Sequence, residues 1–140
     1  MNKYILIGLV ITFLVGAGIG YRLIGPKTNA PITTGKVVRT KLIAKKDEWR
    51  FIPEDLDVTQ GDRVIMEVVN EDSYDHGIAI DAFGVSQRMP ANKTITVEFT
   101  VTKGGEFPMY CSVPCGEGMV DGKKRTHFDM IGKLRVNSSK

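Results

Sequence analysis

The chain has 140 residues, a formal net charge of +3 and 42% hydrophobic residues. This length suits one modest domain and excludes a large enzyme with its own substrate domain. The small, evenly mixed charge argues against nucleic-acid binding. The apolar content argues against disorder throughout the chain, and two cysteines exclude a disulfide-rich scaffold.

The N-terminal segment differs from the rest of the chain. The 18 residues from Tyr4 to Tyr21 carry no charge and are flanked by Lys3 and Arg22. A helix of this length nearly spans a hydrocarbon core of roughly 30 Å. We therefore predict a retained transmembrane anchor over residues 1–24, while the same pattern also suits a cleaved signal peptide.

The composition changes after the apolar segment. Residues 25–35 contain two prolines and two glycines among small polar residues, which predicts a linker. From residue 25 onward the chain has 12 Val, 8 Ile and 10 Thr but only 3 Leu and 5 Ala. Because β-branched residues favour strands, we predict a β-rich domain over residues 36–140.

Alternating apolar residues predict strands with one buried face. The clearest alternation runs through residues 93–101 and through residues 64–68. Further short strands are predicted at residues 37–44, 48–51, 76–80, 106–110 and 131–136. Turn residues separate these segments, and many short strands at such spacing are typical of a sandwich or a barrel.

The only cysteines and histidines of the chain are potential metal ligands. Cys111, Cys115 and His127 lie with Met130 in one 20-residue window, and His76 begins a predicted strand. Thiolate, imidazole and thioether are soft or borderline ligands, which favour copper over magnesium or calcium. All the cysteines and histidines of the chain can therefore serve one copper site.

Other interpretations of these residues stay open. The two cysteines can form a disulfide in an exported interaction module. Zinc can use the cysteines and histidines, although it gains little from a thioether. A catalytic Cys–His pair is also conceivable, but no third residue that would orient it is evident.

The pattern Cys-Ser-x-x-Cys-Gly from Cys111, followed by His-x-x-Met-x-Gly-x-Leu-x-Val from His127, resembles the dinuclear copper (CuA) domain of cytochrome c oxidase subunit II. The segments 49–53, 58–64 and 71–77 look like the strands and the first histidine segment of that family. The resemblance implies an all-β fold, a cupredoxin-like Greek-key β-sandwich, here preceded by one N-terminal transmembrane helix.

The resemblance also implies six ligands for two copper ions. Two thiolates would bridge both ions, one imidazole would bind each ion, and a thioether and a backbone carbonyl would be the remaining ligands. The bridging thiolates would be Cys111 and Cys115, and the two imidazoles His76 and His127. The thioether would be that of Met130 and the carbonyl that of Val113. Such a site leaves no open coordination position for a substrate, so it would relay electrons and not catalyse bond chemistry.

The implied function is that of a non-catalytic electron-transfer subunit. It would accept an electron from a donor such as a cytochrome or another cupredoxin and pass it to a haem-containing subunit of a haem-copper oxidase or related reductase. The domain would be held by a single membrane pass on the extracytoplasmic side, as in shorter variants of subunit II. The alternative is a free-standing, membrane-anchored copper carrier or metallochaperone of the same fold.

The chain departs from the family pattern between the second cysteine and the second histidine. The family has three residues there, whereas residues 116–126 intervene here, with three glycines and the basic run 123–125. Met119 lies where the family has its histidine. We expect an inserted surface loop that bulges away, with a basic tip exposed beside the copper and His127 as the ligand. Met119 is the alternative ligand.

Overall fold

The computed structural model describes residues 2–24 and 35–138. The chain divides into two compact units, Met1–Ala30 and Pro31–Lys140, and each is described by itself. Nearly all of the predicted linker, residues 25–34, lies outside the described residues.

The described part of the first unit is the helix α1 (Lys3–Ile24). It begins just before the predicted apolar span and ends shortly after it. The stretch Lys3–Gly20 has a mean hydropathy of 1.9 and is long and apolar enough to cross a membrane. The helix therefore fits a membrane anchor in length and composition.

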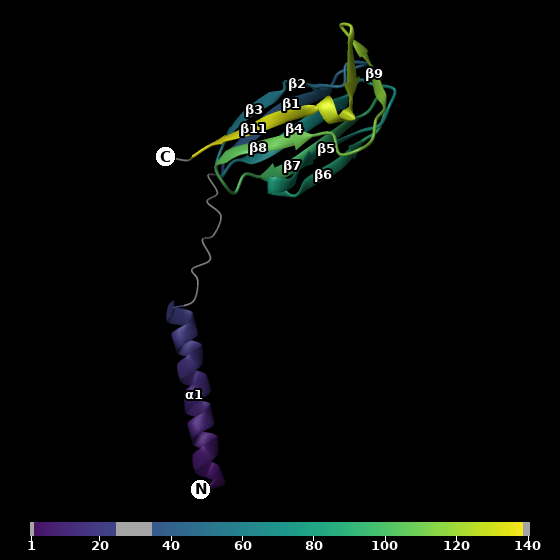
Figure 1. The fold of residues 1–140 in the computed structure, drawn as a ribbon. Coiled ribbons are helices and arrows are strands. Elements are labelled where there is room, and N and C mark those ends of the chain that lie inside the picture. The colour runs from purple at the N-terminus through teal and green to yellow at the C-terminus, as the bar shows by residue number, and fades with distance from the viewer. Residues whose placement is uncertain (1, 25–34, 139–140) are drawn as a thin grey trace. The chain divides into compact units, whose positions relative to one another are not determined.

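The second unit contains two β-sheets that pack as a sandwich (Figure 1). The first sheet has the strand order β2-β1-β4-β7. Its strands are β1 (Val37–Ala44), β2 (Phe51–Ile52), β4 (Arg63–Asn70) and β7 (Thr94–Thr100). β1 and β4 are parallel, and the other neighbours are antiparallel. In β4 every second side chain is buried, which is the period of a strand with one face on the core.

The second sheet has the strand order β3-β11-β8-β5-β6. Its strands are β3 (Asp55–Thr59), β5 (His76–Ile80), β6 (Val85–Met89), β8 (Gly105–Tyr110) and β11 (Ile131–Asn137). β3 and β11 are parallel, and the other neighbours are antiparallel. A short 3-10 helix, η1 (Asp81–Phe83), joins β5 to β6.

Side chains from both sheets meet in one core. Its fully buried large residues include Phe51, Leu42, Met66, Ile78, Ile80, Met109 and Leu134. The two parallel pairs arise because the chain crosses between the sheets instead of turning back within one of them. The predicted all-β sandwich is therefore confirmed.

Six of the seven predicted strands correspond to β1, β4, β5, β7, β8 and β11. The seventh, predicted at residues 48–51, is wrong. The chain turns after β1, where the Lys45 amide donates to the Arg50 carbonyl at 3.1 Å, and β2 begins only at Phe51. Within this turn Trp49 has a φ of 45°, a left-handed conformation that a strand does not contain.

Two strands of the second sheet, β3 and β6, are absent from the predicted strands. In β6 only Val85 and Met89 are buried, and the three residues between them are exposed. This edge strand therefore lacks the alternation on which the prediction depends.

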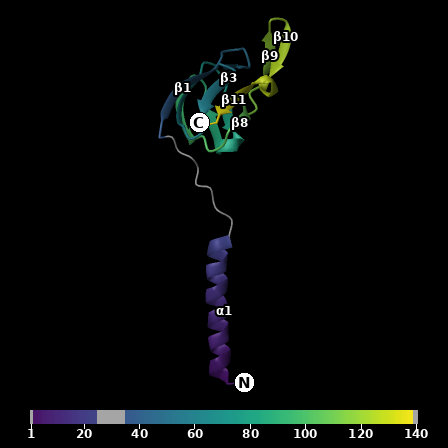
Figure 2. The same ribbon diagram turned by 90° about the vertical axis from the view of Figure 1, so that its left-hand side faces the viewer.

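A β-hairpin replaces the predicted loop between Cys115 and His127. It consists of β9 (Glu117–Val120) and β10 (Lys123–Thr126) and rises from one end of the sandwich (Figures 1 and 2). Its two turn residues, Asp121 and Gly122, have φ values of 50° and 74°, the positive values that a type I′ turn requires.

The expected basic tip is therefore wrong in its placement. The acidic and glycine residues of the turn form the tip, and the basic run 123–125 lies within β10. Lys124 pairs across the hairpin with Glu117 at 2.8 Å, which offsets part of the positive charge. A second 3-10 helix, η2 (His127–Asp129), leads from β10 into β11.

Candidate metal centre

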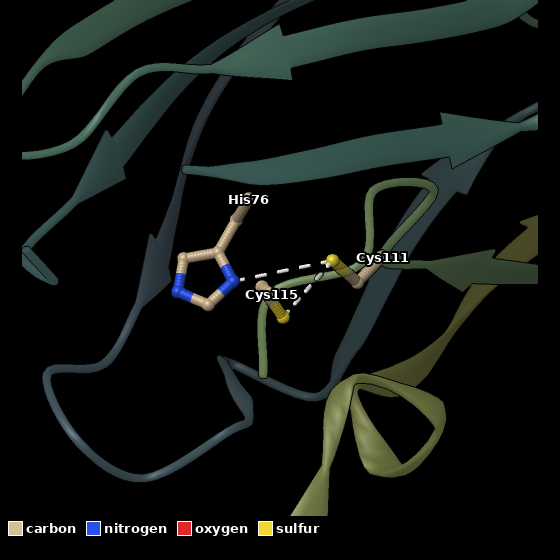
Figure 3. A group of neighbouring side chains, drawn as sticks. All are labelled: His76, Cys111 and Cys115. Atoms are coloured by element: carbon tan, nitrogen blue, oxygen red, sulfur yellow. Dashed lines mark hydrogen bonds between the residues drawn. The ribbon is translucent and has the colours of Figure 1, made fainter. Parts of the chain in front are cut away.

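Both cysteines lie in the loop that connects β8 to the hairpin, and both are buried free thiols. The Cys111 amide donates to the Met130 carbonyl at 3.0 Å, which ties the start of this loop to the residue before β11. The two Sγ atoms are 3.7 Å apart and point toward each other (Figure 3). They are thus two separate thiols, not a disulfide.

His76 faces this pair from the first position of β5 (Figure 3). Its side chain is fully buried, with Nδ1 4.0 Å from the Cys111 Sγ. Its other ring nitrogen, Nε2, lies 3.3 Å from a carboxylate oxygen of Asp72. A proton on Nε2 satisfies this carboxylate and leaves the Nδ1 lone pair toward the sulfur atoms.

The Asp72 carboxylate is itself buried and held by the backbone. It accepts hydrogen bonds from the Ser73 amide at 2.8 Å and the Asp47 amide at 3.3 Å. The Asp72 amide in turn donates to the Asn70 side chain at 2.9 Å. Asp72 is not predicted from the sequence, because a carboxylate four residues before a histidine carries no signal until β5 and the loop before it are folded.

Hydrogen bonding between the two thiols makes their ionisation unequal. The contact with Cys115 lowers the pKa of the Cys111 thiol to about 4, against the effect of burial, and His76 and the Gly77 amide add to the lowering. The same contact and burial raise the pKa of Cys115. The pair therefore loses its first proton readily and its second with difficulty, so a cation is needed for both to ionise.

The pKa of His76 responds to two opposing influences. Burial lowers it because a charged imidazolium loses hydration, whereas the hydrogen bonds to Cys111 and Asp72 raise it and outweigh the burial. The histidine and the first thiolate thus stabilise one another in the absence of metal.

Gly77 allows the cysteine loop to lie against β5. A Cβ atom at this position would come within 2.4 Å of the Ser112 hydroxyl and 2.9 Å of a Val113 methyl group. Any side chain here would push the loop away from the strand that carries His76. The His-Gly pair in the sequence is the signal from which this close approach could have been predicted.

The thioether and the carbonyl expected as ligands also lie beside the thiols. The Met130 side chain is fully buried, with its Sδ 3.8 Å from the Cys115 Sγ. The Val113 carbonyl oxygen lies 3.2 Å from the Cys111 Sγ. Each thiol therefore has one of these two groups as its neighbour.

His127 lies apart from this cluster. Among the described residues, the group whose ligand atoms all lie within 4.8 Å of one another is His76, Cys111 and Cys115. His127 is half-buried in η2 and lines, with Cys111, a largely apolar cavity of about 340 Å³. Its Nδ1 is buried and has no hydrogen-bond partner within the described part of the chain. A buried polar atom without a partner is unfavourable, so this nitrogen has a vacant interaction that a metal ion would satisfy.

Met119 occupies a different environment from Met130. Its side chain is 67% exposed on β9, whereas that of Met130 is fully buried beside Cys115. The exposed thioether has no place in the buried group of sulfur and nitrogen atoms. Of these two methionines, only Met130 therefore lies with the buried thiols.

The donor atoms fit copper. Two thiols, the His76 Nδ1 and the Met130 thioether form a soft, buried group, and the buried Nδ1 of His127 lies apart from it. The exposed carboxylates that magnesium or calcium prefer do not take part in this group. The residues present thus agree with a copper ion or ions held inside the end of the sandwich.

Comparison with known proteins agrees with this architecture. The family model of the cupredoxin-like domain matches residues 27–120, more than half of the chain. No curated protein matches the sequence. The matched region includes both cysteines and His76 but ends before His127, at the last residue of β9.

Several solved structures share the fold. Auracyanin A, a "blue" copper protein of Chloroflexus aurantiacus, is 20% identical with a TM-score of 0.57, over 72% of this chain and 99% of its own. A chain of a haem-copper terminal oxidase dimer is 19% identical with a TM-score of 0.56, over 96% and 97%. The copper nitrite reductase of Nitrosomonas europaea is 18% identical with a TM-score of 0.57, over 75% and 43%. The chain therefore belongs to the cupredoxin-like domain family, whose fold is associated with copper-dependent electron transfer.

Proposed function

We propose that this domain holds a dinuclear copper centre of the CuA type and relays electrons to a membrane haem-copper oxidase or a related reductase. The observation that carries the proposal is the pair of buried thiols 3.7 Å apart. A mononuclear blue-copper site uses a single cysteine with two histidines, so a second thiol at this distance has no role there. Two thiolates that face each other can instead bridge two metal ions.

The proposed ligand set would serve two copper ions. Cys111 and Cys115 would be the bridging thiolates, and His76 would bind one ion and His127 the other. Met130 would be a weak ligand on one side and the Val113 carbonyl the corresponding ligand on the other. Copper would supply the one-electron redox chemistry.

The chain's own contribution is to keep the ligands in place. His76 is fixed by β5 and Asp72, and the cysteine loop is pinned to the residue before β11 by the Cys111 amide. Because these contacts are made by the protein itself, the ligands would need to move little when an electron arrives or leaves. Burial of both thiols keeps water from the sulfur atoms.

The membrane location and the partner belong to the same proposal. α1 is apolar and long enough to anchor the chain. The oxidase chain that shares the fold belongs to a haem-copper terminal oxidase dimer and is matched over 97% of its length. We place the domain on the extracytoplasmic side, where a donor such as a cytochrome or another cupredoxin would reach it.

A second candidate function is supported by a separate observation. The compact group contains one histidine and two thiols, with His127 outside it. Three such ligands suit a single exchangeable Cu(I) ion, as a membrane-anchored copper carrier would need. The two functions differ in copper stoichiometry.

Copper content and magnetic resonance decide between them. The full chain in detergent is reconstituted with copper, and copper per chain is measured together with the electron paramagnetic resonance spectrum. The relay requires about two coppers that share one unpaired electron. One exchangeable, diamagnetic Cu(I) would establish the carrier. Cys111→Ser and Cys115→Ser should each abolish the mixed-valence signal, because a bridge loses one arm.

The topology is tested on native membranes. We expect the mature chain to retain residues 4–21 and the domain to be accessible from the extracytoplasmic side. N-terminal sequencing and protease accessibility of sealed membranes measure these two properties. A mature chain that begins near Tyr21 would contradict the anchor and leave a secreted cupredoxin.

A further inference from the structure

The inserted hairpin meets the sandwich where Gly118 lies against the ring of Trp49. A Cβ atom added to Gly118 would come within 2.3 Å of two atoms of that ring, far inside any tolerable contact. Gly118 is one of the three glycines of the expected surface loop. Here glycine is required for a close approach between the hairpin and an aromatic side chain.

Trp49 also contacts the cysteine loop. Its indole Nε1–H donates to the Cys115 carbonyl at 3.3 Å. The ring is buried in the core and lies tilted against Tyr74, with the ring centroids 6.2 Å apart. One side chain thus touches the hairpin, the backbone of a thiol residue and the loop that leads to His76.

The turn that carries Trp49 aims the indole at this position. Trp49 has a left-handed backbone, with a φ of 45°, which is uncommon for a bulky residue. Hydrogen bonds from the Glu48 amide to the Lys45 carbonyl at 3.2 Å and from the Lys45 amide to the Arg50 carbonyl at 3.1 Å close the turn. An unfavourable conformation that is held in this way indicates that the surroundings fix it.

We propose that Trp49 is a positioning residue that fastens the hairpin to the sandwich through Gly118 and fixes the Cys115 backbone through its Nε1–H. The inference rests on the proposed function. Trp49 contacts the chain on both sides of Gly116, where the cysteine loop becomes the hairpin. Cys115 and His127 lie at the two ends of the insertion, so a hairpin free to swing would move both of them.

The position of Trp49 also explains how the site tolerates the extra residues. A long insertion costs little entropy in itself, but it removes the short connection that would otherwise hold Cys115 and His127 near each other. The ring of Trp49 fixes the hairpin near its base at Gly118, and the Trp49 Nε1–H fixes the backbone of Cys115. Attachment of the hairpin to Trp49 therefore takes the place of a short connection between Cys115 and His127.

The metal-free full chain in detergent tests the attachment. Trp49 is the only tryptophan, so its fluorescence reports this site without a label. Gly118→Ala should increase acrylamide quenching severalfold and accelerate amide hydrogen exchange over residues 115–126 roughly tenfold, because an overpacked contact must open. Gly104→Ala is the matched control, since a Cβ atom there meets nothing closer than 3.4 Å. It should change neither measurement.

A second variant separates the hydrogen bond from the ring contact. Trp49→Phe keeps an aromatic ring near Gly118 but removes the Nε1–H. We expect faster amide exchange over residues 111–117 and, after copper loading, shifted thiolate absorption bands and altered hyperfine splitting with copper per chain unchanged. Gly118→Ala should shift the same bands.

Three outcomes would overturn the inference. They are unchanged quenching and exchange in Gly118→Ala, unchanged exchange in Trp49→Phe, and copper spectra identical to those of the parent in both variants. The metal-free measurements do not depend on the number of coppers. A parent chain that binds one copper would therefore overturn the dinuclear relay alone, while the exchange data still decide the role of Trp49.

Discussion

The two histidines of the site stand in unlike surroundings. His76 begins a strand inside the second sheet, is fully buried, and has Asp72 on one ring nitrogen and Cys111 near the other. His127 lies in a 3-10 helix after the hairpin, is half-buried, and has a buried Nδ1 without a partner. His76 thus has a neighbour at each ring nitrogen, whereas the His127 Nδ1 has no partner among the described residues, which costs about 1–3 kcal/mol.

The two histidines also differ in their access to a partner protein. His76 has no exposed surface, so it can bind metal inside the domain but cannot contact another protein. Beside His127 the Phe128 side chain is 75% exposed, and the two rings lie 3.8 Å apart between centroids. In the proposed relay, electron exchange with another protein would need a short path to the surface, and the exposed Phe128 beside His127 would provide it.

The largest expected effect comes from removal of the His127 ring. His127→Ala should destroy the dinuclear spectrum and lower the copper content from about two to about one per chain, because one ion loses its only imidazole. Met119→Ala should leave both properties unchanged, because that side chain is exposed on β9. Copper analysis and electron paramagnetic resonance measure the effects, and the opposite pattern would exchange the two assignments.

The Asp72 carboxylate offers the next test, on the His76 side. Asp72→Asn removes the charge that faces Nε2, so we expect the free energy of unfolding of the metal-free chain to fall by about 1–3 kcal/mol. The reduction potential of the loaded site should also shift, because the imidazole loses a charged partner. Chemical denaturation and redox titration measure the two effects.

Glu106→Gln is the matched control for Asp72→Asn. This carboxylate is exposed and pairs with Lys133 at 3.4 Å on the outer face of the sheet. Its loss should change stability by less than about 1 kcal/mol and leave the potential unchanged. Equal effects of the two variants would show that Asp72 has no special relation to the site.

Acid should loosen the His127 side first. Hydrogen bonds from the Thr126 amide and hydroxyl lower the pKa of Asp129 below its usual 3.8. Because the pKa is lower in the folded chain, the Asp129 carboxylate stabilises the fold above about pH 3.8. This contribution is lost as the pH falls through the pKa of the folded state.

The pKa of His76 is raised, so its contribution has the opposite sign and is present at low pH. In the metal-free chain, amide exchange over residues 126–129 should therefore increase between about pH 5 and pH 2, relative to that of β5, once both are corrected for intrinsic rates. Equal protection of both segments over this range would contradict the difference between the two sides.

Sequence patterns predicted the sheets well because most strands have one buried face. β4 and β7 alternate as expected, and β5 and β1 were predicted with their observed bounds. The hairpin was missed although Asp121–Gly122 is a strong type I′ turn signal. Its flanking strands lack a buried apolar face, since all of their side chains are exposed or half-buried.

The site was predictable to the extent that its residues are of a rare type. Two cysteines, two histidines and one methionine stand out in a short chain, and their spacing carries the family resemblance. Asp72 and Trp49 were not predictable, because an aspartate and a tryptophan acquire their contacts only when loops distant in sequence meet. Groups that act on ligands from a second layer leave no pattern of their own.

The smallest expected effect concerns the charge of the hairpin on the His127 side. Replacement of residues 123–125 by glutamine removes three cations, but Lys124 is already paired with Glu117. The rate of electron transfer from an acidic donor should therefore fall by less than about tenfold at low salt and converge with the parent rate above about 0.15 M.

Lys103→Gln is the control and should leave this rate unchanged. Lys103 lies in the turn before β8, at the opposite end of that strand from Cys111. Because steering acts on association, stopped-flow measurements at several ionic strengths separate it from any change in the site, whose absorption should stay that of the parent. A rate that is independent of both the substitutions and the salt would place the donor elsewhere on the domain, and the exposed ring of Phe128 would then lie outside the contact.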